Sequence, residues 1–344
     1  MASYADRPDY GLSHRSRSEN GLVPEIEISD LKVKAGEKAQ GYLPVAARGD
    51  GTSIRLPLLV VNGLQEGCTL VVSGGVHGDE YEGPEAIRRL WRQLDPDQLR
   101  GVVLCVPVVN VPAFEVGSRE SPIDHINMNR IFPGRQDGSI SDKIAHLFFH
   151  EVVLRADYFL DLHSGGKAFA MAPTVVYLEE GDEQFRAEEL GFARAVGIDL
   201  LWKGKGLWAS AHVAAVKRDI PAILVETGEE GRCSEPLVEL HERTILNAMK
   251  HLHMIQGTPQ LPERWMIVRG TYLHSGAGGI FHPRAHLKQM VRQGDRLGVI
   301  TDLFGEIVET VEAPYDGIIC SIRTFPSIRP GEWTVFVGEL VETV

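Results

Sequence analysis

The pattern of hydrophobic and polar residues changes along the chain. Between about residues 22 and 62 apolar and polar residues alternate, as in Glu25-Ile26-Glu27-Ile28, and Gly and Pro turns separate the alternating stretches. This alternation predicts half-buried strands. Later stretches are continuously apolar and predict strands that are buried on both faces of a sheet. They cover residues 70–72, 102–106, 158–160 and 222–225.

Segments with helical periodicity separate these apolar runs. Between residues 84 and 94, Ile87, Leu90, Trp91 and Leu94 form one apolar stripe. The same spacing predicts helices over 141–154, 182–196 and 234–254. Strands that alternate with helices predict an α/β domain, with a largely parallel sheet covered by helices on both faces. In such sheets the functional residues gather at the carboxyl ends of the strands.

Two prolines after the last predicted helix mark a change in character. Pro259 and Pro262 prevent that helix from continuing. Glycine turns and short apolar stretches such as VRQGDRLGVITD and WTVFVGELVE follow, and they predict a small all-β barrel or sandwich. We therefore predict a loosely ordered lead-in over 1–21, an α/β catalytic domain over 22–256 and an accessory β domain over 263–344.

Composition and charge narrow the possible partners. The net charge of −12 disfavours nucleic acids and anionic membrane surfaces, because both require cationic patches. No apolar run approaches the roughly 20 residues of a membrane helix, and the polar amino terminus lacks a secretion signal, so we expect a cytoplasmic protein. The four cysteines lie far apart, which favours reduced thiols over disulfides or a thiolate zinc site. A small molecule or a peptide is the expected substrate.

Potential metal ligands follow two of the predicted strands. GGVHGDEYEG carries His77 and Glu80, and DLHSGG carries His163. Two imidazoles and one carboxylate form a catalytic zinc set, with the fourth position left for water. Alternatively, each residue has an ordinary role, such as a loop histidine or a glutamate at a helix start. The short spacing and the distant third ligand favour one Zn²⁺ per chain.

Further chemistry is expected from one strand end and one loop. Glu226 ends the apolar run of ILVETG, which suits a general base, although a salt-bridged strand-end carboxylate is the alternative. The segment RESPIDHINMNRIFPG, residues 119–134, has little regular periodicity and carries Arg119, Asn127, Asn129 and Arg130. It is typical of a binding loop, because arginine suits both carboxylate recognition and oxyanion stabilisation.

A second histidine pair has the spacing of a helical zinc site. His146 and His150 lie four residues apart on a predicted helix. No glutamate follows His146, and two phenylalanines lie between the histidines. We therefore expect this pair on a packed or partly solvated helix face rather than at a metal.

Taken together, these motifs resemble those of a known family. GGVHGDEYEG, NMNRIFPG, DLHSGG and the strand-end Glu226 are similar to the motifs of the succinylglutamate desuccinylase and aspartoacylase family. The resemblance implies a zinc carboxypeptidase-like fold, with a mixed, mostly parallel sheet flanked by helices. It also implies that the carboxyl-terminal β domain packs beside the active-site entrance and that the protein self-associates as a homo-oligomer.

The resemblance also implies roles for the candidate residues. The histidine–glutamate–histidine set would hold zinc. Glu226 would activate a water molecule and later protonate the leaving amine, while Arg119 would polarise the scissile carbonyl. Asn129 and Arg130 would bind the α-carboxylate of an N-acylated amino acid. The implied reaction is amide hydrolysis that gives a carboxylic acid and a free amino acid.

The choice of substrate stays open at this point. The Ser164-Gly165-Gly166 loop differs from those of typical aspartoacylases and succinylglutamate desuccinylases. It is more similar to the branch that contains N-acetyl-diaminobutyrate deacetylases. Glu229 and Glu230 either favour neutral or cationic substrate side chains or are solvated loop charges. The alternatives are a metallocarboxypeptidase or peptide amidase acting on short peptides, and a non-catalytic binding protein, but the full ligand set disfavours the binding protein.

Overall fold

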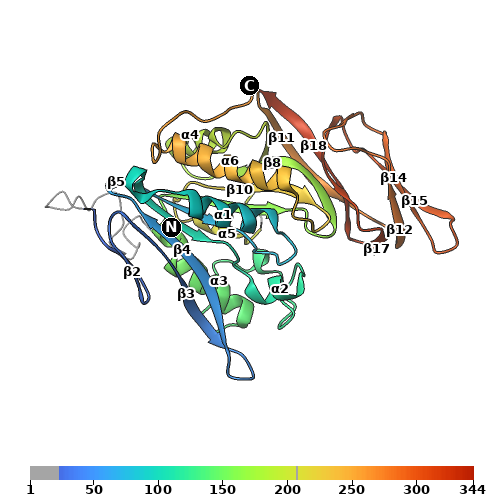
Figure 1. Cartoon of the computed structure of the whole chain (residues 1–344). Helices are drawn as coiled ribbons and strands as arrows, with labels where there is room; N and C mark the ends of the chain where they lie inside the picture. Colours follow the sequence, from blue (N-terminus) through green and yellow to red (C-terminus); the bar gives the residue numbers. More distant parts are fainter. Residues whose placement is uncertain (1–22, 207) are drawn as a thin grey trace.

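A mixed twelve-stranded sheet forms the centre of the protein (Figure 1). The structure is a computed structural model, and it describes residues 23–206 and 208–344; the predicted lead-in over 1–21 lies outside them. The strand order in this sheet is β13-β16-β18-β11-β9-β8-β10-β7-β5-β6-β4-β3. The strands of its amino-terminal part are β3 (Glu37–Ala47), β4 (Ser53–Asn62), β5 (Gln65–Ser73), β6 (Arg100–Val106), β7 (Tyr158–Ser164), β8 (Phe169–Leu178), β9 (Leu200–Gly204) and β10 (Ala222–Glu229). A separate pair, β1 (Ile26–Ile28) and β2 (Leu31–Val33), precedes them.

The middle of the sheet is parallel, whereas its outer pairings are largely antiparallel. Strands β6, β5, β7 and β10 are neighbours, and each adjacent pair among them runs parallel. Ser73 on β5 lies opposite Asp161 on β7, and His163 on β7 lies opposite Glu226 on β10. The parallel register therefore brings polar residues from three strands to one edge of the sheet, as predicted.

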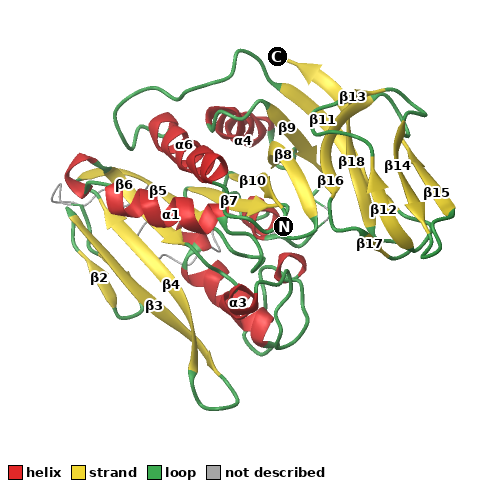
Figure 2. Ribbon diagram, turned by 45° about the vertical axis from the view of Figure 1, so that its right-hand side comes forward, coloured by secondary structure: helices red, strands yellow, loops and turns green. Residues whose placement is uncertain are grey.

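Helices cover both faces of the sheet and enclose two apolar cores (Figure 2). One face packs against α3 (Ile140–Glu151) and α5 (Ala211–Val216). The other face packs against α1 (Glu82–Gln93), α4 (Glu183–Ala195) and α6 (Glu235–His251). This arrangement explains why the central strands are continuously apolar, because both of their faces are removed from water.

The four predicted helices are present, with small shifts at their ends. The helix expected from residue 141 begins at Ile140, because Ser139 is its N-cap. Ser139 accepts the N–H of Asp142, and the Asp142 carboxylate accepts the N–H of Ser139, which forms a capping box. The short helix α5 and α2 (Val111–Val116) were not predicted, since six residues carry too little periodicity. The described residues also form three single-turn helices, η2 (Pro96–Gln98), η3 (Met128–Arg130) and η4 (Val153–Arg155).

The carboxyl-terminal segment is all-β, as predicted, and part of it extends the main sheet. Strand β11 (Met266–His274) pairs in parallel with β9, and it pairs antiparallel with β18 (Trp333–Thr343). The remaining members of the main sheet are β13 (Met290–Val291) and β16 (Gly317–Arg323). A four-stranded sheet contains β12 (Gly279–Pro283), β14 (Arg296–Thr301), β15 (Ile307–Glu312) and β17 (Ser327–Ile328). The division into two domains at 22–256 and 263–344 stays a prediction.

Two further features of the described residues agree with the composition. Each cysteine is a free thiol; Cys68, Cys105 and Cys320 are buried, whereas Cys233 is exposed. Among residues 23–206 and 208–344, no helix is long and apolar enough to cross a lipid bilayer.

Candidate metal centre and its cavity

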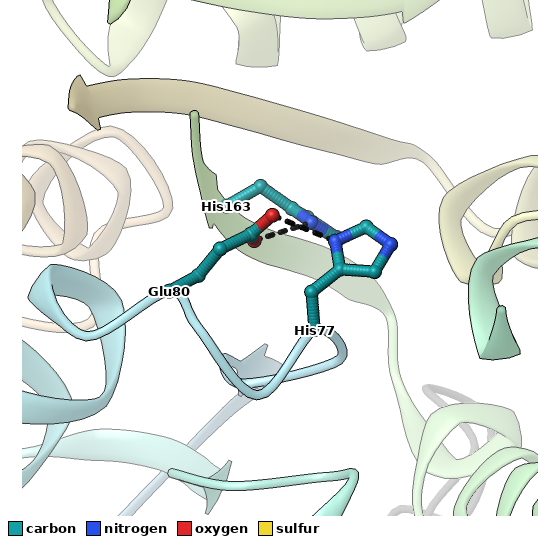
Figure 3. Close-up of side chains that lie close together, drawn as sticks. All are labelled: His77, Glu80 and His163. Atoms are coloured by element: carbon teal, nitrogen blue, oxygen red, sulfur yellow. Dashed lines mark hydrogen bonds and ion pairs between the residues drawn. The ribbon is translucent and has the colours of Figure 1, made fainter. Parts of the chain in front are cut away.

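Three side chains that can bind a metal converge at the edge of the sheet (Figure 3). His77 Nδ1 lies 2.7 Å from Glu80 Oε1, and His163 Nδ1 lies 3.0 Å from Glu80 Oε2. The three potential ligand atoms all lie within 4.8 Å of one another. All three side chains are buried. The structure therefore brings together the group that the sequence predicted from two separate motifs.

The glycines in the first motif allow the chain to turn between the ligands. Gly75 follows β5 with a φ of +61°, a conformation that side chains other than glycine rarely adopt. Gly78, directly after His77, packs against the backbone of Ala113 on α2, where a Cβ atom would overlap the Ala113 carbonyl. The glycines thus allow a tight loop that returns Glu80 towards His77.

Each histidine is oriented by a hydrogen bond at its other ring nitrogen. His163 Nε2 lies 3.1 Å from Asp161 Oδ2, and His77 Nε2 lies 3.2 Å from Asn127 Oδ1. If the Nδ1 atoms bind a metal, the hydrogen of each ring is on Nε2, where the Asp161 and Asn127 oxygens accept it. Ser73 donates to the other oxygen of Asp161 at 2.6 Å. These partners hold the ligand nitrogens towards Glu80.

The electrostatics of the centre favour a cation. Burial would lower the pKa of His163, but Asp161 and Glu80 raise it well above the ordinary value. Burial would raise the pKa of Glu80, but His77 and His163 lower it, so Glu80 is ionised. Burial and Arg119 lower the pKa of His77 to about 4, which keeps its imidazole neutral as metal ligation requires. The donor set and its burial fit a divalent metal ion such as Zn²⁺.

Glu226 lies next to this group and reaches a cavity. It is the register partner of His163 on β10, and its side chain is partly accessible. Burial of its carboxyl, with repulsion from Glu80, raises the pKa of Glu226 to about 8, against the attraction of His163 and Arg119. Its Oε2 atom has no hydrogen-bond partner within the described chain. A carboxylate in this position has a free oxygen for proton transfer.

The predicted binding loop contributes three side chains to the same cavity. Arg119, Asn129 and Arg130 all line it. Arg119 Nη1 donates to Glu80 Oε1 at 3.3 Å, so its guanidinium lies at the edge of the metal centre. Asn129 is buried, and its side-chain oxygen has no partner among the described residues. Two positive charges and an unpaired amide oxygen therefore face a shared space.

The cavity has a volume of about 400 Å³ and is larger than the metal centre alone requires. Aromatic side chains from the α/β region and from the carboxyl-terminal segment also line it, namely Phe169, Trp202, Trp208, Tyr272 and Trp333. Neither these aromatic residues nor the orienting Asp161 were predicted from the sequence to belong to the site. Asp161 could have been found, because it precedes His163 by two positions and so lies on the same face of the strand. The aromatic residues carry no local signal that links them.

Other sequence candidates lie outside this site. His150 Nδ1 bonds to the His146 backbone oxygen at 2.9 Å. Within the described ranges, the His77 centre is the only group of three or more potential ligands that could hold a metal. Neither Glu229 nor Glu230 lines the cavity. Glu230 forms an ion pair of 2.6 Å with Arg232. The hypothesis that these two glutamates select the substrate side chain therefore has no contact to support it, and the alternative of solvated loop charges agrees with their positions.

Comparisons with known proteins agree with this geometry. The catalytic-domain model of the succinylglutamate desuccinylase/aspartoacylase family matches residues 66–252. The chain is 30% identical over 316 residues to an N-alpha-acetyl-L-2,4-diaminobutyric acid deacetylase from Halomonas elongata, and the match covers 88% of this chain and 92% of that protein.

Solved structures of similar proteins share the fold. A succinylglutamate desuccinylase/aspartoacylase from Rhodobacter sphaeroides superimposes with a TM-score of 0.81 at 30% identity, over 88% of this chain and 96% of that one. The product-bound ectoine utilization protein EutE (DoeB) from Ruegeria pomeroyi has a TM-score of 0.83 at 28% identity, over 92% and 99% of the two chains. This chain therefore belongs to the succinylglutamate desuccinylase/aspartoacylase family.

Proposed function

We propose that this protein hydrolyses the amide bond of a small N-acylated amino acid with the help of one zinc ion. The observation that carries the proposal is the shared cavity, in which Glu226, Arg119 and Arg130 lie beside the convergent histidine–glutamate–histidine group. The deacetylase from Halomonas elongata, whose substrate is named in its description, supports the reaction class. The core sheet is proposed to be of the zinc carboxypeptidase type.

The metal would be held by His77, Glu80 and His163. A zinc ion bound by two imidazoles and one carboxylate supplies Lewis-acid chemistry and lowers the pKa of water. Asp161 and Asn127 would keep the two imidazoles in the tautomer that leaves Nδ1 unprotonated.

Glu226 is proposed to transfer the proton. Its carboxylate would take a proton from the attacking water while the oxygen of that water bonds to the amide carbon. When the carbon–nitrogen bond breaks, the protonated Glu226 would give this proton to the leaving nitrogen. The products are a carboxylic acid and a free amine, and the carboxylate of Glu226 is restored.

The binding loop is proposed to position the substrate. Arg119 would donate hydrogen bonds to the carbonyl oxygen as negative charge develops on it. Arg130 and Asn129 would hold the α-carboxylate, because a guanidinium can bind both oxygens of a carboxylate and an amide adds a further donor. Together these contacts hold the amide carbon near Glu226.

The test is the release of free amine from a panel of N-acetyl amino acids, N-succinyl amino acids and short peptides. Each reaction is run with and without a metal chelator, and zinc is restored after chelation. We expect release from at least one class of N-acylated amino acid, loss of that release with the chelator and recovery with zinc. Release from peptides alone would favour a carboxypeptidase. No release from the whole panel, with zinc bound, would contradict the proposal.

A further inference from the structure

Four aromatic side chains that line the cavity contact one another in series. We call Trp202, Trp208, Tyr272 and Trp333 the aromatic wall. Tyr272 and Trp333 are stacked, with ring centroids 4.1 Å apart and an interplanar angle of 12°. Trp333 and Trp208 are stacked at 5.9 Å and 26°, and Trp202 meets Trp208 edge to face at 5.9 Å. The rings therefore support one another and present a preformed apolar surface.

The wall contains an unusual share of the large aromatic residues of the chain. The sequence has five tryptophans, and three of them line this one cavity. Trp208 is 38% exposed, although a large ring at a protein surface is usually more deeply buried. Apolar surface that is kept accessible inside a cavity is typical of a ligand-binding site. We therefore expect the wall to contact the substrate.

The charges around the cavity disfavour a cationic substrate side chain. Glu226 is the one carboxylate among the described residues that line the cavity. Positive charges are more numerous, and the cationic lining residues are Arg119, Arg130, Lys203, Lys205 and Arg269. A substrate ammonium group would therefore meet several like charges and compete with the proposed proton transfer for Glu226.

Two of these cations are partly neutralised from outside the cavity. Lys203 and Arg269 both form ion pairs with Glu179. Because both cations already have an acidic partner, they attract an anionic group of the substrate less strongly. What remains beside the wall is a surface of aromatic rings, and Glu226, the one carboxylate among the described lining residues, is assigned to the proposed proton transfer. Such a surface suits an uncharged planar group.

The wall begins next to the residue proposed to bind the α-carboxylate. The Arg130 guanidinium carbon lies 4.6 Å from the centre of the Trp208 ring. In an amino acid the side chain is attached to the carbon that also bears the carboxylate. A substrate whose carboxylate is held by Arg130 therefore has its side chain within reach of Trp208, whereas its acyl group lies across the scissile amide.

We propose that the preferred substrates are N-acyl derivatives of amino acids with aromatic side chains, and that these side chains stack on the aromatic wall. The inference rests on the proposed function, because it uses the α-carboxylate contact of Arg130. Ring stacking and apolar burial would favour an aromatic over a methyl side chain by about tenfold or more. The wall thus selects the amino-acid side chain, not the acyl group.

Steady-state kinetics test this preference directly. The substrates are N-acetyl-L-tryptophan, N-acetyl-L-phenylalanine, N-acetyl-L-alanine, Nα-acetyl-L-2,4-diaminobutyrate and N-benzoyl-L-alanine. We expect kcat/KM for the two aromatic amino acids to exceed that for N-acetyl-L-alanine by about tenfold or more. A preference for the diaminobutyrate compound would overturn the inference. A gain with the benzoyl compound alone would also overturn it, because the aromatic group would then be on the acyl side.

Variants of the wall connect the preference to Trp208. Trp208→Ala should lower the ratio of kcat/KM for N-acetyl-L-tryptophan to that for N-acetyl-L-alanine by about tenfold, and Trp208→Phe should keep part of it. Phe304→Ala is the matched control, because Phe304 is 94% exposed and does not line the cavity. An unchanged ratio in Trp208→Ala would refute the role of the wall.

Binding without turnover separates this inference from the proposed function. Calorimetric titration of Glu226→Gln with the same N-acetyl amino acids measures their dissociation constants directly. If N-acetyl-L-tryptophan binds about tenfold or more tightly than N-acetyl-L-alanine but the wild-type protein releases no amine, the hydrolase proposal fails and the aromatic site stands. If amine is released with no such ranking in binding or turnover, the hydrolase stands and the aromatic site fails.

Discussion

Ser73 and Asp161 are register partners on the parallel strands β5 and β7, and the Ser73 hydroxyl donates a hydrogen bond of 2.6 Å to Asp161 Oδ1. Both side chains are fully buried. The second oxygen of Asp161 lies 3.1 Å from His163 Nε2. A buried serine on one strand therefore fixes a carboxylate that orients a candidate ligand on the next strand.

Asp161→Asn should weaken zinc binding while the fold is kept. The amide has nearly the same volume as the carboxylate. The change removes the negative charge of Asp161, which holds the His163 ring in place and makes this ring a more basic metal ligand. We expect a loss of zinc affinity of about 10- to 100-fold, measured by competition with a chromophoric chelator. Asp199→Asn is the matched control, since Asp199 pairs with Lys288 and does not line the cavity. Equal zinc affinity in Asp161→Asn and wild type would contradict this role.

His163→Ala should lose bound metal together with activity. The change removes one of three ligand atoms that lie within 4.8 Å of one another, and the remaining two cannot complete a stable protein site. Metal content after dialysis and amine release are the two measurements. His146→Ala should retain both, because His146 lies on α3 outside the candidate centre. Normal metal content in His163→Ala would move the third ligand elsewhere.

Glu226→Gln should separate metal binding from catalysis. The glutamine cannot accept a proton, so kcat should fall by about 10²- to 10⁴-fold, while His77, Glu80 and His163 still bind zinc. Metal content and steady-state kinetics are measured on the same preparation. Glu229→Gln is the control on the same strand, and it should leave both kcat and the substrate ranking unchanged because Glu229 does not line the cavity. Full activity in Glu226→Gln would exclude this residue as the base.

Glu189 should make the protein less stable as the pH rises. It is fully buried on α4, and burial raises its pKa from 4.5 to about 8, against a weaker opposing hydrogen bond from the Leu178 backbone. At pH values between 4.5 and about 8, the Glu189 carboxyl keeps its proton in the folded state but loses it in the unfolded state. The free energy of unfolding therefore falls with rising pH across this window, by up to about 1.4 kcal/mol per pH unit.

Glu189→Gln tests this effect, because its side chain is neutral at every pH. Urea unfolding at about pH 5 and about pH 8 gives the free energy of unfolding of each protein. The loss of stability between the two pH values should be smaller in Glu189→Gln than in wild type. Glu183→Gln, an exposed change at the start of the same helix, should behave like wild type. An equal loss in wild type and Glu189→Gln would exclude Glu189 as its source.

The amino-acid sequence by itself determined the secondary-structure elements and the main candidate residues of the site. Continuous apolar runs and helical stripes are local signals, so they predicted the central strands and four helices to within a few residues. His77, Glu80, His163 and Glu226 were found because the carboxyl ends of parallel strands meet at one edge of a sheet. The helix start at Ile140 was missed because Ser141 is as suitable an N-cap residue as Ser139, which is the N-cap in the structure.

Only the tertiary structure decided what surrounds those candidate residues. The aromatic wall joins Trp202 and Trp208, near β9, to Tyr272 and Trp333, on β11 and β18. These segments meet because β11 pairs with β9 and β18 pairs with β11, and such long-range pairings leave no periodic signal in either segment. The charge balance of the cavity likewise depends on side chains from distant parts of the chain. Residue spacing therefore determined the expected chemistry, whereas the packing of distant strands determined the shape and polarity of the space that would bind the substrate.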